Sequence, residues 1–366
     1  MNDQELRAKM RKAMDSRLSG LKDDPWLAQR VMNRADKEEP GMKKKLRFSV
    51  VLVIVTVLVL GTALAVALHT DFYHHVFGNE TRENVEAHTE THENGKGGTV
   101  DDFYPAQEYV AADPEEAERL IGEQVTSEPV IAQMGDHTLT VLSAVRDENA
   151  LVMELDLACP TGVRGLNYDR LTNEGKGAWF ADDAGYFFIV ENAAEKMYVD
   201  LKNSSETCLR IYYYCVFFEK LPDGESPVLT AAAVTGDSGP EGQVFDPQQI
   251  ILPACKAVSA ARFAAGDGSA IELSPFSLKV CPVPEAENGS GAVVLQMDPG
   301  SLERIVIGMD TGETYTVLEE GKTNNTLYLC GGLGTSGQDI SMVLNRLVDP
   351  AKVKYIRVDG VEYLPE

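Results

Sequence analysis

The sequence predicts a mainly β protein that carries one membrane-spanning helix near its N-terminus. Residues 48–68 form an apolar run of 21 residues without a charge, and from about residue 128 short alternating or apolar runs are separated by turn-forming residues. A helix of that length spans roughly 30 Å, the thickness of the hydrocarbon core of a bilayer. Short strands at this spacing, without helical crossovers between them, indicate antiparallel sheets.

Residues 1–47 are expected to form a basic arm with two short helices. Apolar residues recur every four positions in the first helix, at Leu6, Met10, Met14 and Leu18. Asp24-Pro25 is a typical start for the second, whose apolar residues are the candidates for contact with a cytoplasmic partner: Trp26, Leu27 and Val31. Two short helices bury too little surface to be stable alone, so the arm is either a loosely ordered stalk or is completed by a partner.

Basic residues flank only the N-terminal side of the apolar run, at Lys43, Lys44, Lys45 and Arg47. The positive-inside rule therefore places residues 1–47 in the cytoplasm and the chain from residue 69 outside the cell membrane. A cleavable signal peptide is the alternative, because Ala63-Leu64-Ala65 has the form of a cleavage site. The apolar run is longer than a usual signal sequence and nearly fifty residues precede it, so an uncleaved signal-anchor is predicted.

The formal charge divides at the predicted anchor. Residues 1–47 have a net charge of +5, and residues 69–366 have a net charge of −29. The basic arm is expected either to contact anionic lipid head groups or only to orient the helix. The acidic exterior argues against binding of nucleic acid. Gly61 and Ala65 form a small-xxx-small pair through which two anchors could pack as a homodimer.

Residues 69–127 are expected to be a polar, acidic linker with one short helix that begins at Asp113-Pro114. Their low apolar content argues against a packed core. His88 and His92 are four residues apart and would share one face of a helix, where they could bind zinc or copper. A solvated linker explains the same histidines. No metal site or cofactor is therefore predicted, and these two histidines are kept as candidate ligands.

Residues 128–254 are expected to be a first antiparallel β module. A hairpin is predicted around Glu148-Asn149, followed by strands at 185–191, 196–202, 208–220 and 227–234. The run from Ile211 to Phe218 contains three consecutive tyrosines and is typical of a central strand buried on both faces.

Residues 255–366 are expected to be a second β module. Gly266-Asp267-Gly268, Asp310-Thr311-Gly312 and Asp359-Gly360 predict hairpin turns. A two-turn amphipathic helix is predicted near the end from the spacing of Ile340, Val343, Leu344 and Leu347.

The sequence contains no recognisable catalytic motif. His137 is the only histidine in the predicted globular part, in an expected surface turn, and no GxSxG motif accompanies it. All six cysteines lie on the predicted external side without a CxxC motif, and both disulfides and isolated buried thiols remain open for them. The chain is therefore not predicted to be an enzyme.

Three stretches resemble a family of Gram-positive bacterial single-pass membrane proteins of unknown function that are described as anti-sigma-factor-like. These are DPWLAQRVMNRADKEEPGMKKK, ELSPFSLKV and VLNRLVDPAKVKYIRVDGVEY. The resemblance implies external domains of immunoglobulin-like type and no enzymatic residues. The arm has neither His nor Cys, so the zinc-binding motif of one anti-sigma class is absent.

We therefore expect a non-enzymatic, single-pass type II membrane protein that presents two β-sandwich modules outside the cell. Envelope sensing or signalling through the arm is the expected role. The alternative is an extracellular carboxylate-based hydrolase or a carbohydrate-binding or adhesive surface protein. Two carboxylates suffice for glycoside hydrolysis, and a sequence alone does not show which carboxylates are paired.

Overall fold

The computed structural model describes residues 71–366, with gaps at 79, 94–97, 127, 161, 163–183, 236–242, 245–247, 254–255, 282–301 and 334–338. The chain divides into two units, 1–65 and 66–366, and every described residue belongs to the second. The predicted anchor (48–68) and the candidate residues of the arm (Trp26, Leu27, Val31, Lys43, Lys44, Lys45 and Arg47) lie outside the described residues. Within the described part, none of the helices has both the length and the apolar character needed to cross a bilayer.

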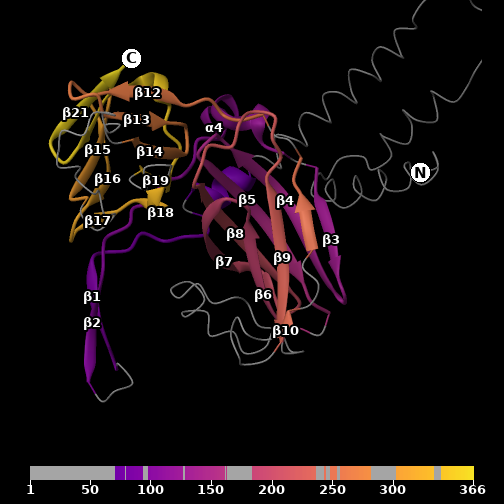
Figure 1. Ribbon diagram of the computed structural model, residues 1–366. Helices are drawn as coiled ribbons and strands as arrows, with labels where there is room; N and C mark the ends of the chain where they lie inside the picture. Colours follow the sequence, from indigo (N-terminus) through magenta and orange to yellow (C-terminus); the bar gives the residue numbers. More distant parts are fainter. Residues whose placement is uncertain are drawn as a thin grey trace, which may run out of the picture. The chain divides into compact units, whose positions relative to one another are not determined.

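The described chain is built mainly from antiparallel β-sheets, as predicted (Figure 1). In the first β region, a five-stranded sheet has the order β3 (Val130–Met134), β4 (His137–Arg146), β5 (Ala150–Ala158), β8 (Cys208–Phe217), β7 (Ala193–Ser205). A four-stranded sheet is centred on β9 (Val228–Thr235), which pairs with β6 (Ala184–Val190), β10 (Gln243–Val244) and β11 (Gln248–Ile251). Apolar side chains from both sheets share one core, so the two sheets pack face to face.

Strand β8 lies inside the five-stranded sheet, between β5 and β7, and both of its faces are buried. Tyr213 and Cys215 belong to the core shared with the four-stranded sheet, whereas Tyr212 and Tyr214 belong to a second core on the opposite face. The prediction of a central strand buried on both faces is therefore confirmed.

The second β region is a ten-stranded antiparallel sheet. Its order is β17 (Thr323–Asn324), β16 (Thr314–Glu319), β15 (Arg304–Met309), β20 (Val353–Val358), β21 (Val361–Pro365), β12 (Ala261–Ala264), β13 (Ala270–Leu273), β14 (Ser277–Cys281), β19 (Asp339–Leu344), β18 (Thr326–Leu333). Only two residue pairs join β12 to β21, and side chains from both sides of this junction share a third core. Asp359 and Gly360 both have positive φ, as a tight hairpin turn requires, which confirms that prediction.

The predicted helix around Ile340 is wrong, because this segment is strand β19. Ile340, Met342 and Leu344 face the core of the ten-stranded sheet, and Val343 faces the second core. A strand that is apolar on both faces produces the same i, i+3, i+4 spacing as an amphipathic helix, so the period alone does not distinguish the two structures.

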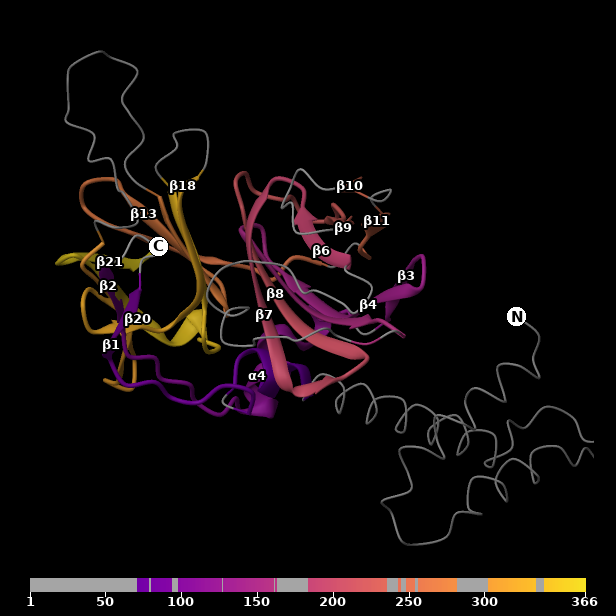
Figure 2. The same cartoon turned by 90° about the horizontal axis from the view of Figure 1, so that it is seen from below.

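The outer face of β8 is covered by segments that the sequence analysis assigned to a linker (Figure 2). Residues 71–76 are helical, and we call residues 71–77 the entry segment. Its aromatic side chains Phe72, Tyr73 and Phe77 are at most 1% exposed, and they share the second core with Ile121 of α4 (Pro114–Ile121). The expectation of a linker without a packed core is therefore wrong at the entry segment. All apolar residues of the entry segment contribute to this core. The mean apolar content of residues 69–127 is low and therefore does not reveal this short apolar cluster.

Helix α4 has the predicted start and continues into a 3₁₀ turn, Gly122–Gln124. The Asp113 side chain accepts hydrogen bonds from the amides of Glu115 and Glu116, and a proline follows it at the first helical turn. At the far end of α4, Arg119 contacts Asp349 at 2.5 Å, just before the 3₁₀ turn Pro350–Lys352. The helix thus joins the outer face of β8 to the ten-stranded sheet.

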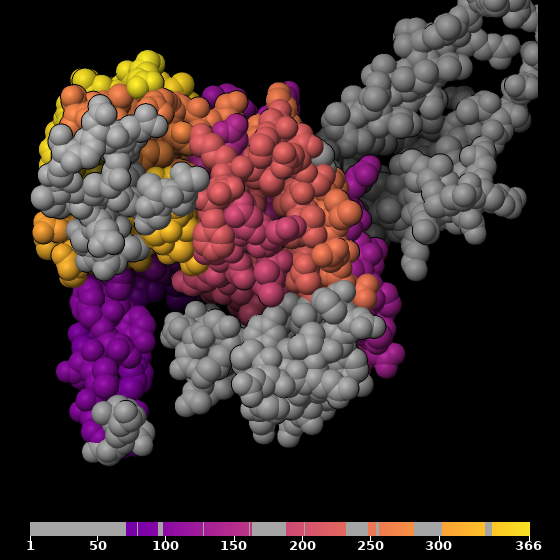
Figure 3. Space-filling view, viewed as in Figure 1, coloured from indigo at the N-terminus to yellow at the C-terminus, as the bar shows by residue number. Residues whose placement is uncertain are grey.

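A two-stranded ribbon, β1 (His88–Glu93) and β2 (Thr99–Tyr104), projects from the body (Figure 3). All residues of β1, and all but the last of β2, are exposed. His88 and His92 both lie on strand β1 and not on a helix, in contrast to the helix considered from their spacing.

We predict that Phe77→Ala lowers the free energy of unfolding by about 3–5 kcal/mol, because it removes a buried ring that contacts Phe72 and Phe276. Phe103→Ala, the same change at a ring that is 48% exposed on the ribbon, should lower it by no more than about 0.5 kcal/mol. Urea unfolding of the full chain measures both. Equal effects of the two substitutions would show that the entry segment is not part of the folded core.

Candidate functional site

The entry segment is held against the five-stranded sheet by a charged contact as well as by its rings. Nδ1 of His75 lies 3.5 Å from a Glu154 carboxylate oxygen on β5. Arg210 of β8 reaches the same oxygen at 2.5 Å and contacts Asp156 at 2.7 Å. His75 and Glu154 side chains are largely buried, at 17% and 7% exposure. The entry segment therefore contacts a row of alternating charges that crosses two neighbouring strands.

Close contact with the Glu154 carboxylate raises the pKa of His75 above its ordinary value, although burial opposes this shift. A raised pKa means that the folded protein binds the proton more tightly than the unfolded chain does. The resulting stability is fully present below the unfolded pKa of about 6.5 and is lost as the pH rises through the folded pKa.

Downstream of the entry segment, the guanidinium group of Arg82 is enclosed by three tyrosine rings. Its central carbon lies 4.1 Å from the ring centroid of Tyr198, 5.2 Å from that of Tyr214 and 5.6 Å from that of Tyr109. Nη2 of Arg82 also donates a hydrogen bond to the Tyr214 hydroxyl at 2.5 Å. Stacking of a guanidinium group on desolvated aromatic rings is favourable, so Arg82 fixes the chain at the outer face of β8.

The chain next forms the base of the ribbon, which we call the strap and define as residues 84–86 and 106–109. Val85 and Gln107 exchange two backbone hydrogen bonds of 2.9 Å. Ala106 pairs in parallel with Thr323 of β17: its amide donates to the Lys322 carbonyl and its carbonyl accepts from the Asn324 amide. The strap thus covers the edge of the ten-stranded sheet at β17.

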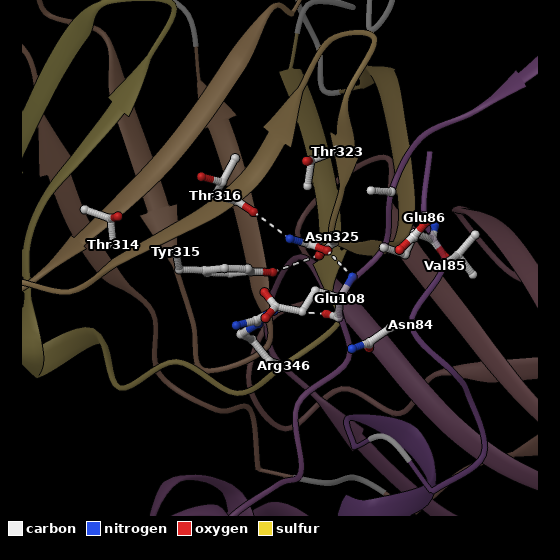
Figure 4. A pocket seen from close by; sticks show the side chains of 12 residues that line it. Asn84, Val85, Glu86, Glu108, Thr314, Tyr315, Thr316, Thr323, Asn325 and Arg346 are labelled. Carbon is white, nitrogen blue, oxygen red and sulfur yellow. Dashed lines mark hydrogen bonds and ion pairs between the residues drawn. The ribbon is translucent and has the colours of Figure 1, made fainter. Parts of the chain in front are cut away.

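A polar groove with a cavity volume of about 540 Å³ lies between the strap and β16–β17 (Figure 4). Its floor is a hydrogen-bonded network around Asn325, which is 3% exposed. Asn325 Oδ1 accepts from the Glu108 amide at 2.8 Å, and Nδ2 donates to the Thr316 carbonyl at 2.8 Å. The Tyr315 hydroxyl donates to the Asn325 carbonyl at 2.8 Å. Both the strap and β16 are therefore bonded to the same side chain.

One end of the groove is closed by Arg346. Its Nη2 lies 3.0 Å from the Glu108 carbonyl and 3.3 Å from the Glu108 carboxylate, and its guanidinium carbon lies 4.3 Å from the Tyr315 ring centroid. The neighbouring Asn345 donates to the same Glu108 carbonyl at 2.8 Å. Glu108 is thus the residue of the strap with the most contacts to the ten-stranded sheet.

The two candidate metal ligands face the same side of the ribbon, separated by Glu90. Nε2 of His88 lies 3.2 Å from one Glu90 oxygen, and Nε2 of His92 lies 3.4 Å from the other. The described residues contain no group of three or more His, Cys, Asp or Glu side chains arranged to hold a metal ion.

The structure places other residues singled out from the sequence as follows. His137 is the first residue of β4 and is 5% exposed, so its assignment to a surface turn is wrong; the turn ends at Asp136. Cys208, Cys215, Cys281 and Cys330 are free thiols in the structure. Cys215 is fully buried in the first core, and burial raises the pKa of its thiol.

No sequence pattern predicted the groove. Asn325, Asn345 and Arg346 are isolated polar residues at strand ends, and no local pattern relates them to Glu108, more than two hundred residues earlier. The Asn324-Asn325 pair that follows Thr323 was the only local signal of an unusual polar position.

No protein-family model matches this sequence, and no curated protein matches it. A solved structure described as the conserved domain protein from Bacillus anthracis is similar over 63% of this chain and 75% of that chain. The sequence identity is 12% and the TM-score is 0.35. A similarity at this level supports no inference about this chain.

We predict that the stabilising contribution of His75 depends on pH. His75→Gln should lower the free energy of unfolding below pH about 6.5 and have a progressively smaller effect as the pH rises through the folded pKa. Urea unfolding of both proteins from pH about 5 to about 8.5 measures this difference. His74→Gln is the matched control, because no carboxylate of the described residues lies within ion-pair range of His74. A pH-independent effect of His75→Gln would exclude the ion pair as the cause.

We also predict that Asn325→Ala lowers the free energy of unfolding by about 1–3 kcal/mol, because two backbone groups lose their partner in a buried site. Hydrogen exchange should accelerate at the amides of Ala106 and Gln107 and stay unchanged in β5. Thr314→Ala, at the exposed rim, is the control and should change stability by no more than about 0.5 kcal/mol. Unchanged exchange in Asn325→Ala would show that the strap is held by other contacts.

Proposed function

We propose that this chain is a non-enzymatic, single-pass membrane protein that senses its surroundings outside the cell and signals through residues 1–47. In this proposal residues 48–68 span the cell membrane, the arm is cytoplasmic, and the β-rich part is external. The sequence supports it through the apolar run, the basic residues before it and the change in net charge across it. The arm would contact a cytoplasmic regulatory protein through Trp26, Leu27 and Val31, in the manner of an anti-sigma factor.

One observation carries the signalling part of the proposal. The entry segment begins three residues after the proposed membrane helix, and its rings are buried in the core that covers β8. A passive tether would need only a flexible connection. A helix packed into the body instead transmits a displacement of the body to the anchor, because packed elements move as units.

The proposal includes two sandwich modules of immunoglobulin-like type, residues 128–254 and 255–366. Support comes from the antiparallel pairing of both regions and from the separate core that each encloses. Buried polar contacts join the two regions. The Asp147 carboxylate accepts from the Ser277 hydroxyl at 2.5 Å, and Asn149 Nδ2 donates to Glu272 at 2.9 Å. Such fixed contacts would let both modules respond as one body.

The alternative of a carboxylate-based hydrolase has less support. Among the described residues, Glu195 is the carboxyl whose pKa burial raises to about 7, a value suited to a general acid. Burial is the cause of this shift, and among the described residues no charged neighbour adds to it. Glycoside hydrolysis requires two carboxyl groups across a cleft.

The topology is tested in spheroplasts that express the full chain with an N-terminal and a C-terminal epitope tag. External protease should remove the C-terminal tag and leave the N-terminal tag on a protected fragment. Protection of both tags, or loss of both, would contradict the proposed orientation.

The coupling is tested by inserting Gly-Ser-Gly-Ser between Thr70 and Asp71. Cells that express this insertion variant should have the same transcript profile as cells that express the chain without residues 1–47, because the flexible insert separates the entry segment from the anchor. The same insert between Gly135 and Asp136, in the β3–β4 turn, is the control and should leave the profile unchanged. If deletion of residues 1–47 alters transcription but the Thr70 insertion does not, the rigid connection has no role. If that deletion also has no effect, the signalling function is wrong.

A further inference from the structure

Three threonines, Thr314, Thr316 and Thr323, line the groove between the strap and β16–β17, and their hydroxyls bond to no other group of the described residues. We propose that this groove binds a neutral saccharide of one or two rings. The cavity volume of about 540 Å³ is within the range of small-molecule sites. The inference goes beyond the proposed topology and signalling and depends on neither.

The composition of the rim is the first argument. Thr314, Thr316, Thr323 and Gln107 line the groove. Within the described structure the three threonine hydroxyls and Nε2 of Gln107 have no hydrogen-bond partner, whereas Oε1 of Gln107 accepts from the Tyr109 hydroxyl at 2.8 Å. Figure 4 shows the three threonines on the side of the groove opposite Asn84, Val85 and Glu86. Hydroxyls both donate and accept, and an amide nitrogen donates. A ligand that satisfies them must itself carry several hydroxyl or amide groups at close spacing, as a sugar ring does.

The charge of the groove excludes anionic ligands. Glu86 and Glu108 contribute two carboxylates. Among the described residues that line the groove, Arg346 is the one cation, and it already contacts Glu108 at 3.3 Å. Residues 69–366 as a whole carry a net charge of −29. A phosphate, sulfate or uronic acid would therefore approach a negative potential without an available positive partner.

The backbone around the groove excludes an extended peptide as the natural ligand. Peptides that bind along a sheet edge pair with free main-chain groups. Here Val85 and Gln107 already bond to each other, and Ala106 bonds to Lys322 and Asn324. The available groups belong to side chains, and these match a polyhydroxylated ligand better than a peptide backbone.

The floor of the groove is rigid. Asn345 is 1% exposed, and its Nδ2 group, the Tyr315 hydroxyl and both polar atoms of Asn325 have hydrogen-bond partners. A site whose floor is already ordered loses little conformational entropy when a ligand binds. The floor of the groove is thus preorganised, and the threonine hydroxyls at its rim are available to bond a ligand.

The test is titration calorimetry on the full chain in lipid nanodiscs, without sugar-based detergents, which would compete. The probes are N,N′-diacetylchitobiose, cellobiose and maltose, with glucuronic acid and trialanine as chemical controls. At least one neutral disaccharide should bind with Kd of about 1 mM or below. The double variant Thr316→Val, Thr323→Val should raise that Kd at least about tenfold, because two hydroxyl contacts are lost.

The matched control is Thr89→Val, Thr99→Val, on the exposed ribbon, which should leave Kd unchanged. Thermal unfolding verifies that each variant is folded. If the variant Thr316→Val, Thr323→Val does not fold, the single variant Thr323→Val replaces it in the titration. Absence of binding by every neutral saccharide at about 10 mM would overturn the proposal. Tighter binding of glucuronic acid or trialanine, or equal loss in the control variant, would overturn it as well. None of these outcomes bears on the insertion experiment at Thr70.

Discussion

Covering the outer face of β8 is the constraint on which the rest of the structure depends. The other face of its sheet packs against β6, β9 and β11, so Tyr212 and Tyr214 would remain in water without a second layer. That layer consists of the entry segment, α4 and residues of the ten-stranded sheet. Burial of large rings is among the strongest contributions to folding, which explains why segments so distant in the sequence meet at this face.

The same covering layer brings charged groups into places where each needs a partner. Arg82 stacks on tyrosines, and His75 contacts the Glu154 carboxylate. An unpartnered charge in such surroundings would cost several kcal/mol. The polar contacts therefore fix the geometry of the layer, while the rings supply most of its stability.

The strap connects this layer to the proposed ligand site. It begins just after Arg82, and its residue Glu108 is bonded to the floor of the groove. A ligand that changes the position of the strap would act on a segment that is continuous with the entry segment and, in the proposed topology, with the membrane anchor. The described contacts along this path are the pairing of Val85 with Gln107, the stacking of Arg82 on Tyr198 and the burial of the rings of the entry segment.

The sequence by itself determined the β class, the succession of strands β4 to β9, the central position of β8 and the tight turn at Asp359-Gly360. These follow from local period and turn chemistry, which act over a few residues. Only the tertiary structure decided that Phe72 and Phe77 belong to the core, that Ile340–Leu344 is a strand, and that Glu108, Asn325 and Arg346 form one groove. These features depend on which surfaces meet, and contacts over more than two hundred residues leave no local periodicity. The membrane segment remains a prediction of the sequence, resting on the length and apolarity of residues 48–68.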